Sequence, residues 1–302
     1  MNAIVLDGRP VARDLRLRAR DELHDLIAQA GSTPSLSILS VGDDPSAQAY
    51  ERAIIRAARG VGMAVESVHL PGSASQDDLD RAIDSLNDDR SVHGVIILQP
   101  LPSHLDRVEV SDRLDPLKDV DGITTFNAGR LFHDDRDVLA PSTPAGGMAL
   151  LKHYDIDIAG RHAVVVGRSP VVGKPMSLML LAANATVSVC HSRTSDLANF
   201  TKQADILISA AGRPGAIQEH MVKPGAIVVD FGVNFIDGAM IGDVNYDPVR
   251  SVAGAITPVP GGTGRVTTMV LVRNTIKAMR LQARDAATFE REFVSTHYRK
   301  GS

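Results

Sequence analysis

The chain has 302 residues, 44% of them hydrophobic, which is enough apolar material for the cores of about two domains. Basic and acidic residues number 32 and 36 and are interspersed, so the net charge of −4 predicts no broad basic surface for nucleic acid or anionic lipid. The single Cys190 cannot form an internal disulfide, and no apolar run approaches the roughly 18 residues of a membrane span. We therefore expect a soluble, cytoplasmic protein that binds neither nucleic acid nor membrane.

Short β-branched runs alternate along the chain with stretches of helical period. They predict strands at 36–41, 94–98, 163–166, 185–189, 206–209 and 226–230. After the first strand, Asp43 or Asp44 is expected to cap a helix that has Pro45 in its first turn. Strands and helices in alternation indicate an α/β fold with a largely parallel sheet.

A domain junction is predicted near residues 135–144. There, Leu139-Ala-Pro-Ser-Thr-Pro144 places two prolines in a polar stretch that should not continue a helix. The glycine-rich passage 256–264 should end the later strands and precede a closing helix at about 266–283, with residues 291–302 frayed. The expected domains are 1–140 with 266–302, and 141–265.

On the first predicted helix, Tyr50, Ile54, Ala57 and Val61 fall on one face. A tyrosine in such a position is more often part of a core than of a ligand site. The acidic segment 115–122 is likewise, taken alone, an ordinary loop turn.

A glycine turn follows the strand at 163–166. The segment Gly167-Arg-Ser-Pro-Val-Val-Gly173 leads into a helical stretch at 176–183. Glycines allow close backbone approach to phosphate, and free N–H groups at a helix start attract anions. The spacing is not G-x-G-x-x-G, so an ordinary strand-to-helix turn is an equal alternative to a dinucleotide site.

The end of the next strand bears on which dinucleotide would bind. Cys190 is followed by His191-Ser-Arg-Thr194, without the acidic residue that binds a ribose 2′-hydroxyl and repels a 2′-phosphate. Ser192 and Arg193, together with Arg168, offer hydrogen bonds and positive charge to such a phosphate. The pattern favours NADP over NAD, and no histidine spacing predicts a metal site.

Taken in order, these motifs resemble the bifunctional methylenetetrahydrofolate dehydrogenase/methenyltetrahydrofolate cyclohydrolase family. The matching segments are Val41-Gly-Asp-Asp-Pro45 with Tyr50, Pro100-Leu-Pro102, Lys118-Asp-Val-Asp-Gly122, Ser142-Thr-Pro-Ala-Gly146, Gly167 to Pro175, and Thr257 to Gly262. The resemblance implies an N-terminal α/β folate-binding domain completed by the C-terminal helix, a Rossmann-like NADP-binding domain, a cleft between them, and a homodimer.

The resemblance also implies roles for individual residues. Tyr50 would stack on the folate ring system, and Asp121 would accept hydrogen bonds from the N–H edge of the pterin. The matching substrate loop is Pro260, Gly261 and Gly262. The matching cofactor residues are Gly167, Arg168, Ser169, Ser192 and Val233 beside the nicotinamide, to which the turn and charge arguments add Gly173 and Arg193.

Two departures from the family pattern affect its chemistry. Ile54 stands where the motif has a lysine, and Arg56 lies about 200° further around the helix, so it cannot simply substitute. Leu98 stands where the motif has a glutamine two positions before Pro100, and the adjacent Gln99 should face the other side of the strand.

These departures predict a selective loss of activity. Hydride removal from the methylene carbon needs no proton transfer by the protein, so positioning can suffice. Hydrolysis of the methenyl cation needs water attack and proton transfer, which an isoleucine and a leucine cannot assist. We expect an NADP-dependent methylenetetrahydrofolate dehydrogenase with weak or lost cyclohydrolase activity.

Other interpretations stay open at this point. Full bifunctionality would follow if a register shift placed Gln99 in the site or if Tyr50 or Asp121 held the water. A non-catalytic folate or nucleotide binder is a second alternative. Changes at Thr263, Arg265 and Val266 leave room for a modified one-carbon substrate.

Overall fold

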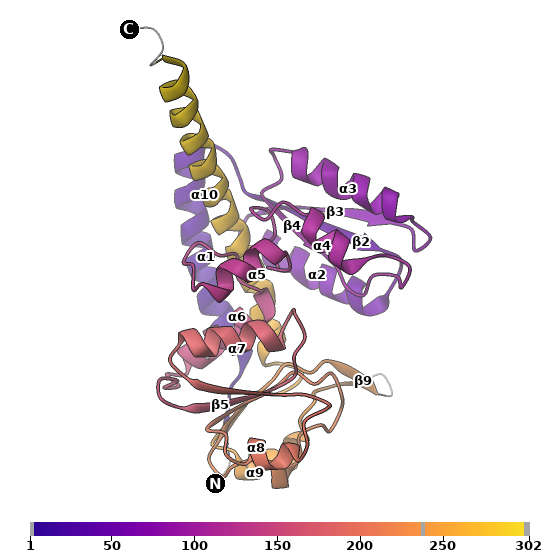
Figure 1. Cartoon of the computed structure of the whole chain (residues 1–302), viewed down its shortest axis with the longest axis vertical. Coiled ribbons are helices and arrows are strands. Elements are labelled where there is room, and N and C mark those ends of the chain that lie inside the picture. The colour runs from indigo at the N-terminus through magenta and orange to yellow at the C-terminus, as the bar shows by residue number, and fades with distance from the viewer. Residues whose placement is uncertain (1–2, 237–238, 299–302) are drawn as a thin grey trace. The chain divides into compact units, whose positions relative to one another are not determined.

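The computed structural model of the chain describes residues 3–236 and 239–298 (Figure 1). Its contacts divide the chain into two compact units. Unit 1 comprises residues 1–18, 128–135 and 140–270, and unit 2 comprises residues 19–127, 136–139 and 271–302. The division falls inside two long helices, α1 (Gly8–Ala30) and α10 (Thr263–Tyr298), so each of them contributes residues to both units.

Unit 2 is built on a parallel sheet with the strand order β3-β2-β4. Its strands and helices are β2 (Ser35–Val41), α2 (Pro45–Arg59), β3 (Ala64–Leu70), α3 (Gln76–Asp88), β4 (Gly94–Ile97) and α4 (Arg107–Arg113). In Figure 1, α2 lies on one face of this sheet, and α3 and α4 lie on the other. Leu39, Val41, Val95 and Ile97 belong to the core under α3 and α4, so the alternate residues point towards α2.

The start of α2 confirms the predicted cap. Asp44 is the N-cap residue, and its carboxylate accepts hydrogen bonds from the backbone N–H groups of Ser46 (2.9 Å) and Ala47 (3.0 Å). Pro45 occupies the first turn, where its missing N–H is not needed. The capped helix therefore begins directly after β2.

Unit 1 is built on a six-stranded parallel sheet with the order β1-β11-β8-β7-β5-β6. The strands are β1 (Ile4–Val5), β5 (His162–Val166), β6 (Thr186–Cys190), β7 (Ile206–Ser209), β8 (Ile227–Asp230) and β11 (Ala255–Ile256). The other elements are α5 (Thr125–Phe132), which spans the division, α6 (Ser142–His153), α7 (Gly173–Ala182), α8 (Leu197–Thr201), the 3-10 turn Glu219–Met221, the antiparallel pair β9 (Asn234–Ile236) and β10 (Ala239–Ile241), and α9 (Tyr246–Val252).

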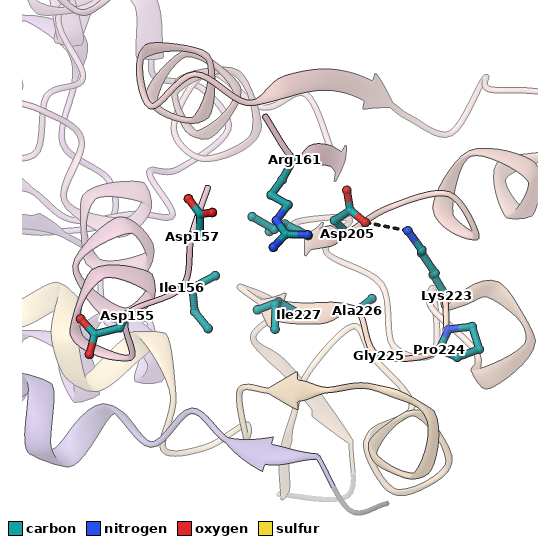
Figure 2. Close-up of a pocket in the computed structure, with 11 residues that line it drawn as sticks. Asp155, Ile156, Asp157, Arg161, Asp205, Lys223, Pro224, Gly225, Ala226 and Ile227 are labelled. Atoms are coloured by element: carbon teal, nitrogen blue, oxygen red, sulfur yellow. Dashed lines mark hydrogen bonds and ion pairs between the residues drawn. The ribbon is translucent and has the colours of Figure 1, made fainter. Parts of the chain in front are cut away.

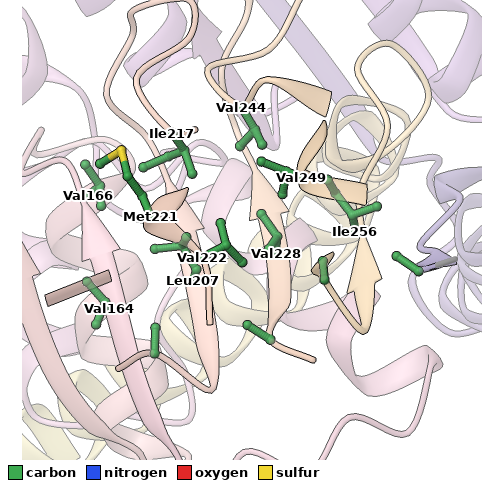
Figure 3. Packing of buried hydrophobic residues seen from close by; sticks show 14 of the residues in the cluster. Val164, Val166, Leu207, Ile217, Met221, Val222, Val228, Val244, Val249 and Ile256 are labelled. Carbon is green, nitrogen blue, oxygen red and sulfur yellow. The ribbon is translucent and has the colours of Figure 1, made fainter. Parts of the chain in front are cut away.

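Helices cover both faces of this sheet. Figure 1 shows α6 and α7 on one face and α8 and α9 on the other. Figure 3 shows the buried aliphatic side chains of Val164, Val166, Leu207 and Val228 in one cluster, in which Val249 lies on the side of Val228. Because β6 and β7 pair with opposite edges of β5, the strand order reverses at β5, and the loops at its carboxyl end mark the usual ligand-binding edge.

The predicted strands and the break in helix at the proline stretch are confirmed. All six predicted strands are present within one residue of their predicted ends, and the fold is α/β with two parallel sheets. No helix continues through the proline stretch: α5 ends at Phe132, and a new helix, α6, begins at Ser142 with Pro141 at its N-cap position and Pro144 in its first turn, where proline is tolerated.

The closing helix is longer than the sequence predicts. It runs from Thr263 to Tyr298, so the expectation of a frayed segment is wrong for residues 291–298, and residues 299–302 lie outside the described residues. Among the described residues, no helix combines the length and apolar composition that a membrane crossing needs.

Candidate active site

The predicted folate contact Tyr50 and the altered motif position Ile54 lie on the inner side of α2. Tyr50 is half-buried, and Ile54, one turn later, is 0% exposed. The arginines of this helix, Arg52, Arg56 and Arg59, are all exposed. The buried face of α2 is therefore hydrocarbon at position 54, with no basic side chain of the same helix in its place.

Leu98 follows β4 on the same side of the sheet. Its backbone N–H donates to the carbonyl of Leu39 (2.8 Å), so the parallel pairing continues in register past Ile97, and its side chain is 2% exposed. Since Ile97 packs under α3 and α4, Leu98 points towards α2. Gln99 is exposed, and its Oε1 accepts from the backbone N–H of Leu101 (3.3 Å).

The loop that carries Asp121 is held by two charged residues that the sequence reasoning did not single out. Lys118 Nζ donates to the carbonyls of Leu86 (2.8 Å), Asn87 (2.6 Å) and Asp89 (2.7 Å), and burial lowers its pKa. The sequence could not predict this role of Lys118, because its three carbonyl partners lie about 30 residues away along the chain. It showed only that a charged residue stands inside a loop motif.

Asp119 is the second of these residues and is fully buried. Its carboxylate accepts from the N–H groups of Ile123 (3.0 Å) and Thr124 (2.9 Å) and from Asn127 Nδ2 (2.9 Å). The loop also lies beside β4, where Val95 N–H donates to the carbonyl of Lys118 (2.7 Å). Asp121 is thus half-buried on a rigid loop next to the strand that leads to Leu98.

In unit 1, the turn after β5 requires its glycines. Gly167 has a φ of +139°, and a Cβ there would lie 2.2 Å from the carbonyl oxygen of Ala210. A Cβ on Gly173 would lie 2.2 Å from the carbonyl oxygen of Gly167. The chain turns back on itself in a space that admits no side chain at either position.

The expectation of free N–H groups in this turn is wrong in part. Ser169 Oγ accepts from the N–H groups of Val172 (3.1 Å) and Gly173 (3.3 Å), and its carbonyl accepts from Lys174 N–H (3.0 Å). The Ser169 hydroxyl and the Arg168 side chain are exposed at the start of α7. These groups and the positive end of α7 fit an anionic phosphate.

The other predicted cofactor residues lie at the same carboxyl edge of the sheet. Ser192 and Arg193 are exposed directly after β6, and Val233, after β8, is 59% exposed. The loop at β6 is shaped by His191, whose N–H donates to Thr194 Oγ1 (2.9 Å). The residues present therefore fit a dinucleotide with a 2′-phosphate.

The predicted substrate loop also belongs to unit 1. Gly261 has a φ of +122°, its carbonyl accepts from Gly8 N–H (2.8 Å), and Gly262 N–H donates to the carbonyl of Pro258 (2.8 Å). A Cβ on Gly8 would lie 2.1 Å from the carbonyl oxygen of Gly262, so the loop rests directly on the start of α1.

Two buried carboxyl groups near Val233 were missed from the sequence. Asp230 ends β8 and is 2% exposed, and Asp243 follows β10 and is 0% exposed. Burial raises the pKa of Asp230 to about 6, the N–H groups bonded to it oppose this rise, and the charge of Asp243 adds to it. The sequence offered one signal for these carboxyl groups, a glycine near each of them in the chain, Gly232 for Asp230 and Gly242 for Asp243.

A cavity of about 380 Å³ lies at the opposite edge of the unit 1 sheet (Figure 2). It is lined by the amino ends of β7 and β8 and by Arg161 before β5, and it contains the Asp205–Lys223 ion pair (2.6 Å). The Lys223 bond lowers the pKa of Asp205. This cavity is not the predicted cofactor position, and no three His, Cys, Asp or Glu side chains in the described chain are grouped to hold a metal ion.

Comparisons with known proteins match almost the whole chain. Residues 6–121 match the catalytic domain of the tetrahydrofolate dehydrogenase/cyclohydrolase family, and residues 141–283 match the NAD(P)-binding domain of that family. The bifunctional protein FolD of Chloroflexus aurantiacus is 48% identical over 281 residues, covering 93% of this chain and 98% of the relative.

Solved structures agree with these matches. The bifunctional FolD methylenetetrahydrofolate dehydrogenase/cyclohydrolase of Campylobacter jejuni is 38% identical with a TM-score of 0.90, covering 93% of this chain and 99% of that one. The methylenetetrahydrofolate dehydrogenase-cyclohydrolase of Trypanosoma brucei, solved with NADP and an inhibitor, is 34% identical with a TM-score of 0.89, covering 94% and 99%.

Proposed function

The chain belongs to the tetrahydrofolate dehydrogenase/cyclohydrolase family, and on this basis we propose that it is an NADP-dependent 5,10-methylenetetrahydrofolate dehydrogenase whose cyclohydrolase activity is weak or lost. Its place would be in one-carbon metabolism, interconverting tetrahydrofolate derivatives. The observation that carries the finer proposal is the pair of buried hydrocarbon side chains, Ile54 and Leu98, on the α2 side of the unit 2 sheet.

The dehydrogenase step asks the protein to hold its reactants. Tyr50 would stack on the flat folate ring, and Asp121 would accept from the pterin N–H groups, with Pro260, Gly261 and Gly262 as the substrate loop. NADP, when bound, accepts the hydride from the methylene carbon. Positioning is sufficient for this step, because no protein group must give or take a proton.

The cofactor residues divide by the part of NADP that they would hold. Gly167, Ser169, Gly173 and the start of α7 would receive the pyrophosphate. Arg168, Ser192 and Arg193 would bind the 2′-phosphate, and Val233 would lie beside the nicotinamide. The Trypanosoma brucei relative, solved with NADP, supports this choice of cofactor.

The cyclohydrolase step needs proton transfer, which the side chains of Ile54 and Leu98 cannot provide. Water must attack the methenyl carbon, and protons must leave the water and reach a ring nitrogen. Neither Ile54 nor Leu98 can donate or accept a proton. Without the motif lysine at position 54, no ammonium repels the methenyl cation that forms on hydride transfer, so the dehydrogenase step is not slowed electrostatically by this change.

Full bifunctionality is the second candidate, because relatives at up to 48% identity are named as bifunctional proteins. The deciding experiment follows NADPH formation from methylenetetrahydrofolate and then decay of the methenyl absorbance. Decay at the spontaneous rate supports the monofunctional proposal, and rapid enzyme-dependent decay supports bifunctionality. Failure of NADP to bind to the correctly folded protein would favour the third alternative, a non-catalytic folate or nucleotide binder.

The organisation of the protein around this function remains a proposal too. A folate-binding part at 1–140 with 266–302 and an NADP-binding part at 141–265 are supported by the separate family matches, although the NAD(P)-binding match extends to 283. A cytoplasmic location rests on the single Cys190.

A homodimer is the proposed assembly. Exposed apolar side chains of β9 and β10, namely Phe235, Ile236 and Met240, offer a surface that a second copy would cover. Analytical ultracentrifugation of the wild type and a Phe235→Ser variant tests this assembly.

A further inference from the structure

The buried carboxyl groups Asp230 and Asp243 lie at the ligand-binding edge of unit 1, yet neither has a part in the proposed chemistry. The loop after β7 begins at Ala210, whose N–H donates to the carbonyl of Val166 (2.8 Å), directly before the Gly167 turn. The loop after β8 carries Val233. The loops after β7 and β8 therefore begin at the same edge as the Gly167 turn, on one side of β5, and Asp243 and Asp230 bond to them.

The Asp243 carboxylate accepts hydrogen bonds from the backbone N–H groups of the loop after β7. Its Oδ2 accepts from Ala211 N–H (2.7 Å), Gly212 N–H (3.0 Å) and, more weakly, Ser209 Oγ (3.5 Å), and its Oδ1 accepts from Arg213 N–H (2.9 Å). Successive N–H groups that converge in this way form an anion-binding turn. In this protein the anion is a side chain of the chain itself.

The same carboxylate reaches the loop after β8. Asn234 Nδ2 donates to Asp243 Oδ1 (3.0 Å), and Asn234 directly follows the exposed Val233. The buried Asp243 side chain thus connects the 211–213 turn to Asn234, the residue next to the predicted nicotinamide contact. The residue before this turn, Ala210, in turn contacts Gly167. A buried carboxylate with five donors is fully satisfied and leaves its loops little freedom.

Asp230 holds Asp243 in place from the other side. Its Oδ1 accepts from Gly232 N–H (2.7 Å) and Asp243 N–H (3.2 Å), and its Oδ2 accepts from Val244 N–H (2.9 Å). A Cβ on Gly232 would lie 2.4 Å from Asp243 Oδ1, and a Cβ on Gly242 would lie 2.0 Å from Asp230 Oδ2. Each carboxyl group therefore needs a glycine to approach the backbone this closely.

We propose that Asp243 is a positioning residue for NADP: through the 211–213 turn and Asn234, it fixes the loop after β7 and the loop after β8, which carries the predicted nicotinamide contact Val233, before the cofactor binds. The inference rests on the proposed function, because it takes this edge as the cofactor site. Loops that are already ordered lose less conformational entropy when the ligand binds, so their loosening should weaken NADP binding more than folate binding.

The first test removes only the link to the β8 loop. Asn234→Ala deletes one amide donor and leaves Asp243 and its turn intact. Asn245→Ala is the matched control, since Asn245 is exposed and its amide donates to Gln218 Oε1 (3.0 Å) in the same unit. Calorimetry without folate should show the NADP dissociation constant raised about three- to tenfold by Asn234→Ala and unchanged by the control. In steady-state assays, the KM for the folate substrate should stay within about twofold of wild type.

The second test reads the loops directly in the protein without cofactor. Asp243→Asn replaces an acceptor oxygen with an NH₂ group, which cannot accept from the turn. Because one of the two acceptor oxygens remains, hydrogen exchange should speed up about tenfold or more either at the Ala211 and Gly212 amides or at the Arg213 amide, with weaker NADP binding. If Asp243→Asn fails to fold, Asn234→Ala alone carries the test.

Each outcome decides a separate point. A wild-type protein that does not bind NADP overturns the proposed function and this inference with it. If the wild type binds NADP and the folded variants bind it equally well, only the positioning role is overturned. The same holds if Asn245→Ala weakens NADP binding as much as Asn234→Ala does.

Discussion

The backbone N–H of Leu98 donates to the carbonyl of Leu39 at 2.8 Å, one residue beyond the last paired residue of β4. This bond keeps the strand in register and directs the Leu98 side chain to the α2 side of the sheet, the side on which Ile54 is buried. Gln99 then falls outside the strand, exposed and bonded to its own loop. The two departures from the family motif therefore act on one face.

Restoring the motif should restore hydrolysis. We expect the double substitution Ile54→Lys with Leu98→Gln to raise the rate of methenyl decay at least about tenfold over wild type, since positioned proton transfer contributes factors of roughly 100 or more. The control is Ile55→Lys with Leu98→Gln, which places the ammonium about 100° away around α2. A folded double variant without any gain would count against our explanation of the loss.

The 2′-phosphate assignment predicts a change in cofactor preference. Arg193→Ala should lower kcat/KM with NADP about tenfold or more and leave the value with NAD nearly unchanged, because a charge-assisted bond to phosphate is lost only with NADP. Arg161→Ala is the control, an exposed arginine at the opposite edge of the sheet. Equal losses with both cofactors would argue against a 2′-phosphate contact.

The Gly167 turn should not tolerate a side chain. Gly167→Ala should lower the free energy of unfolding by about 2 kcal/mol or more, because the new Cβ meets a backbone carbonyl and φ is positive. Gly160→Ala, at a φ of +73° with open space around it, isolates the backbone effect and should cost about 1 kcal/mol. Urea unfolding measures both, and equal costs would mean that the contact with Ala210 yields easily.

Asp230 predicts a pH dependence of stability with a definite sign. Its pKa in the folded protein is about 6, above the ordinary 3.8, so the protonated form stabilises the fold at low pH, and this contribution is lost as the pH rises through 6. Relative to Asp230→Asn, the wild type should lose roughly 1.4 kcal/mol of stability between pH 5 and pH 7.5.

A second aspartate in the same unit provides the control for that experiment. Lys223 lowers the pKa of Asp205, so its contribution is lost only as the pH falls below the ordinary carboxyl range. The stability difference between wild type and Asp205→Asn should stay flat from pH 5 to pH 7.5. A flat difference for Asp230→Asn as well would show that Asp230 titrates normally.

The features predicted correctly from the sequence are those that local chemistry determines. The Asp44 cap, the strands and the position of the glycine turn follow from neighbouring residues. Lys118, Asp119 and Asp243 were missed because their roles depend on distant partners, as in the bond from Ala211 to Asp243 across 32 residues. The roles of Tyr50, Asp121 and the cofactor residues remain predictions, since they concern ligands.

The central claim is that buried hydrocarbon at positions 54 and 98 leaves hydride transfer intact and removes catalysed hydrolysis. The most direct measurement is the decay of methenyltetrahydrofolate with wild-type protein in excess of the spontaneous rate, with NADPH formation measured on the same sample and the Campylobacter jejuni enzyme as positive control. We predict clear NADPH formation with decay at the spontaneous rate. Enzyme-dependent decay that keeps pace with NADPH formation would contradict the claim.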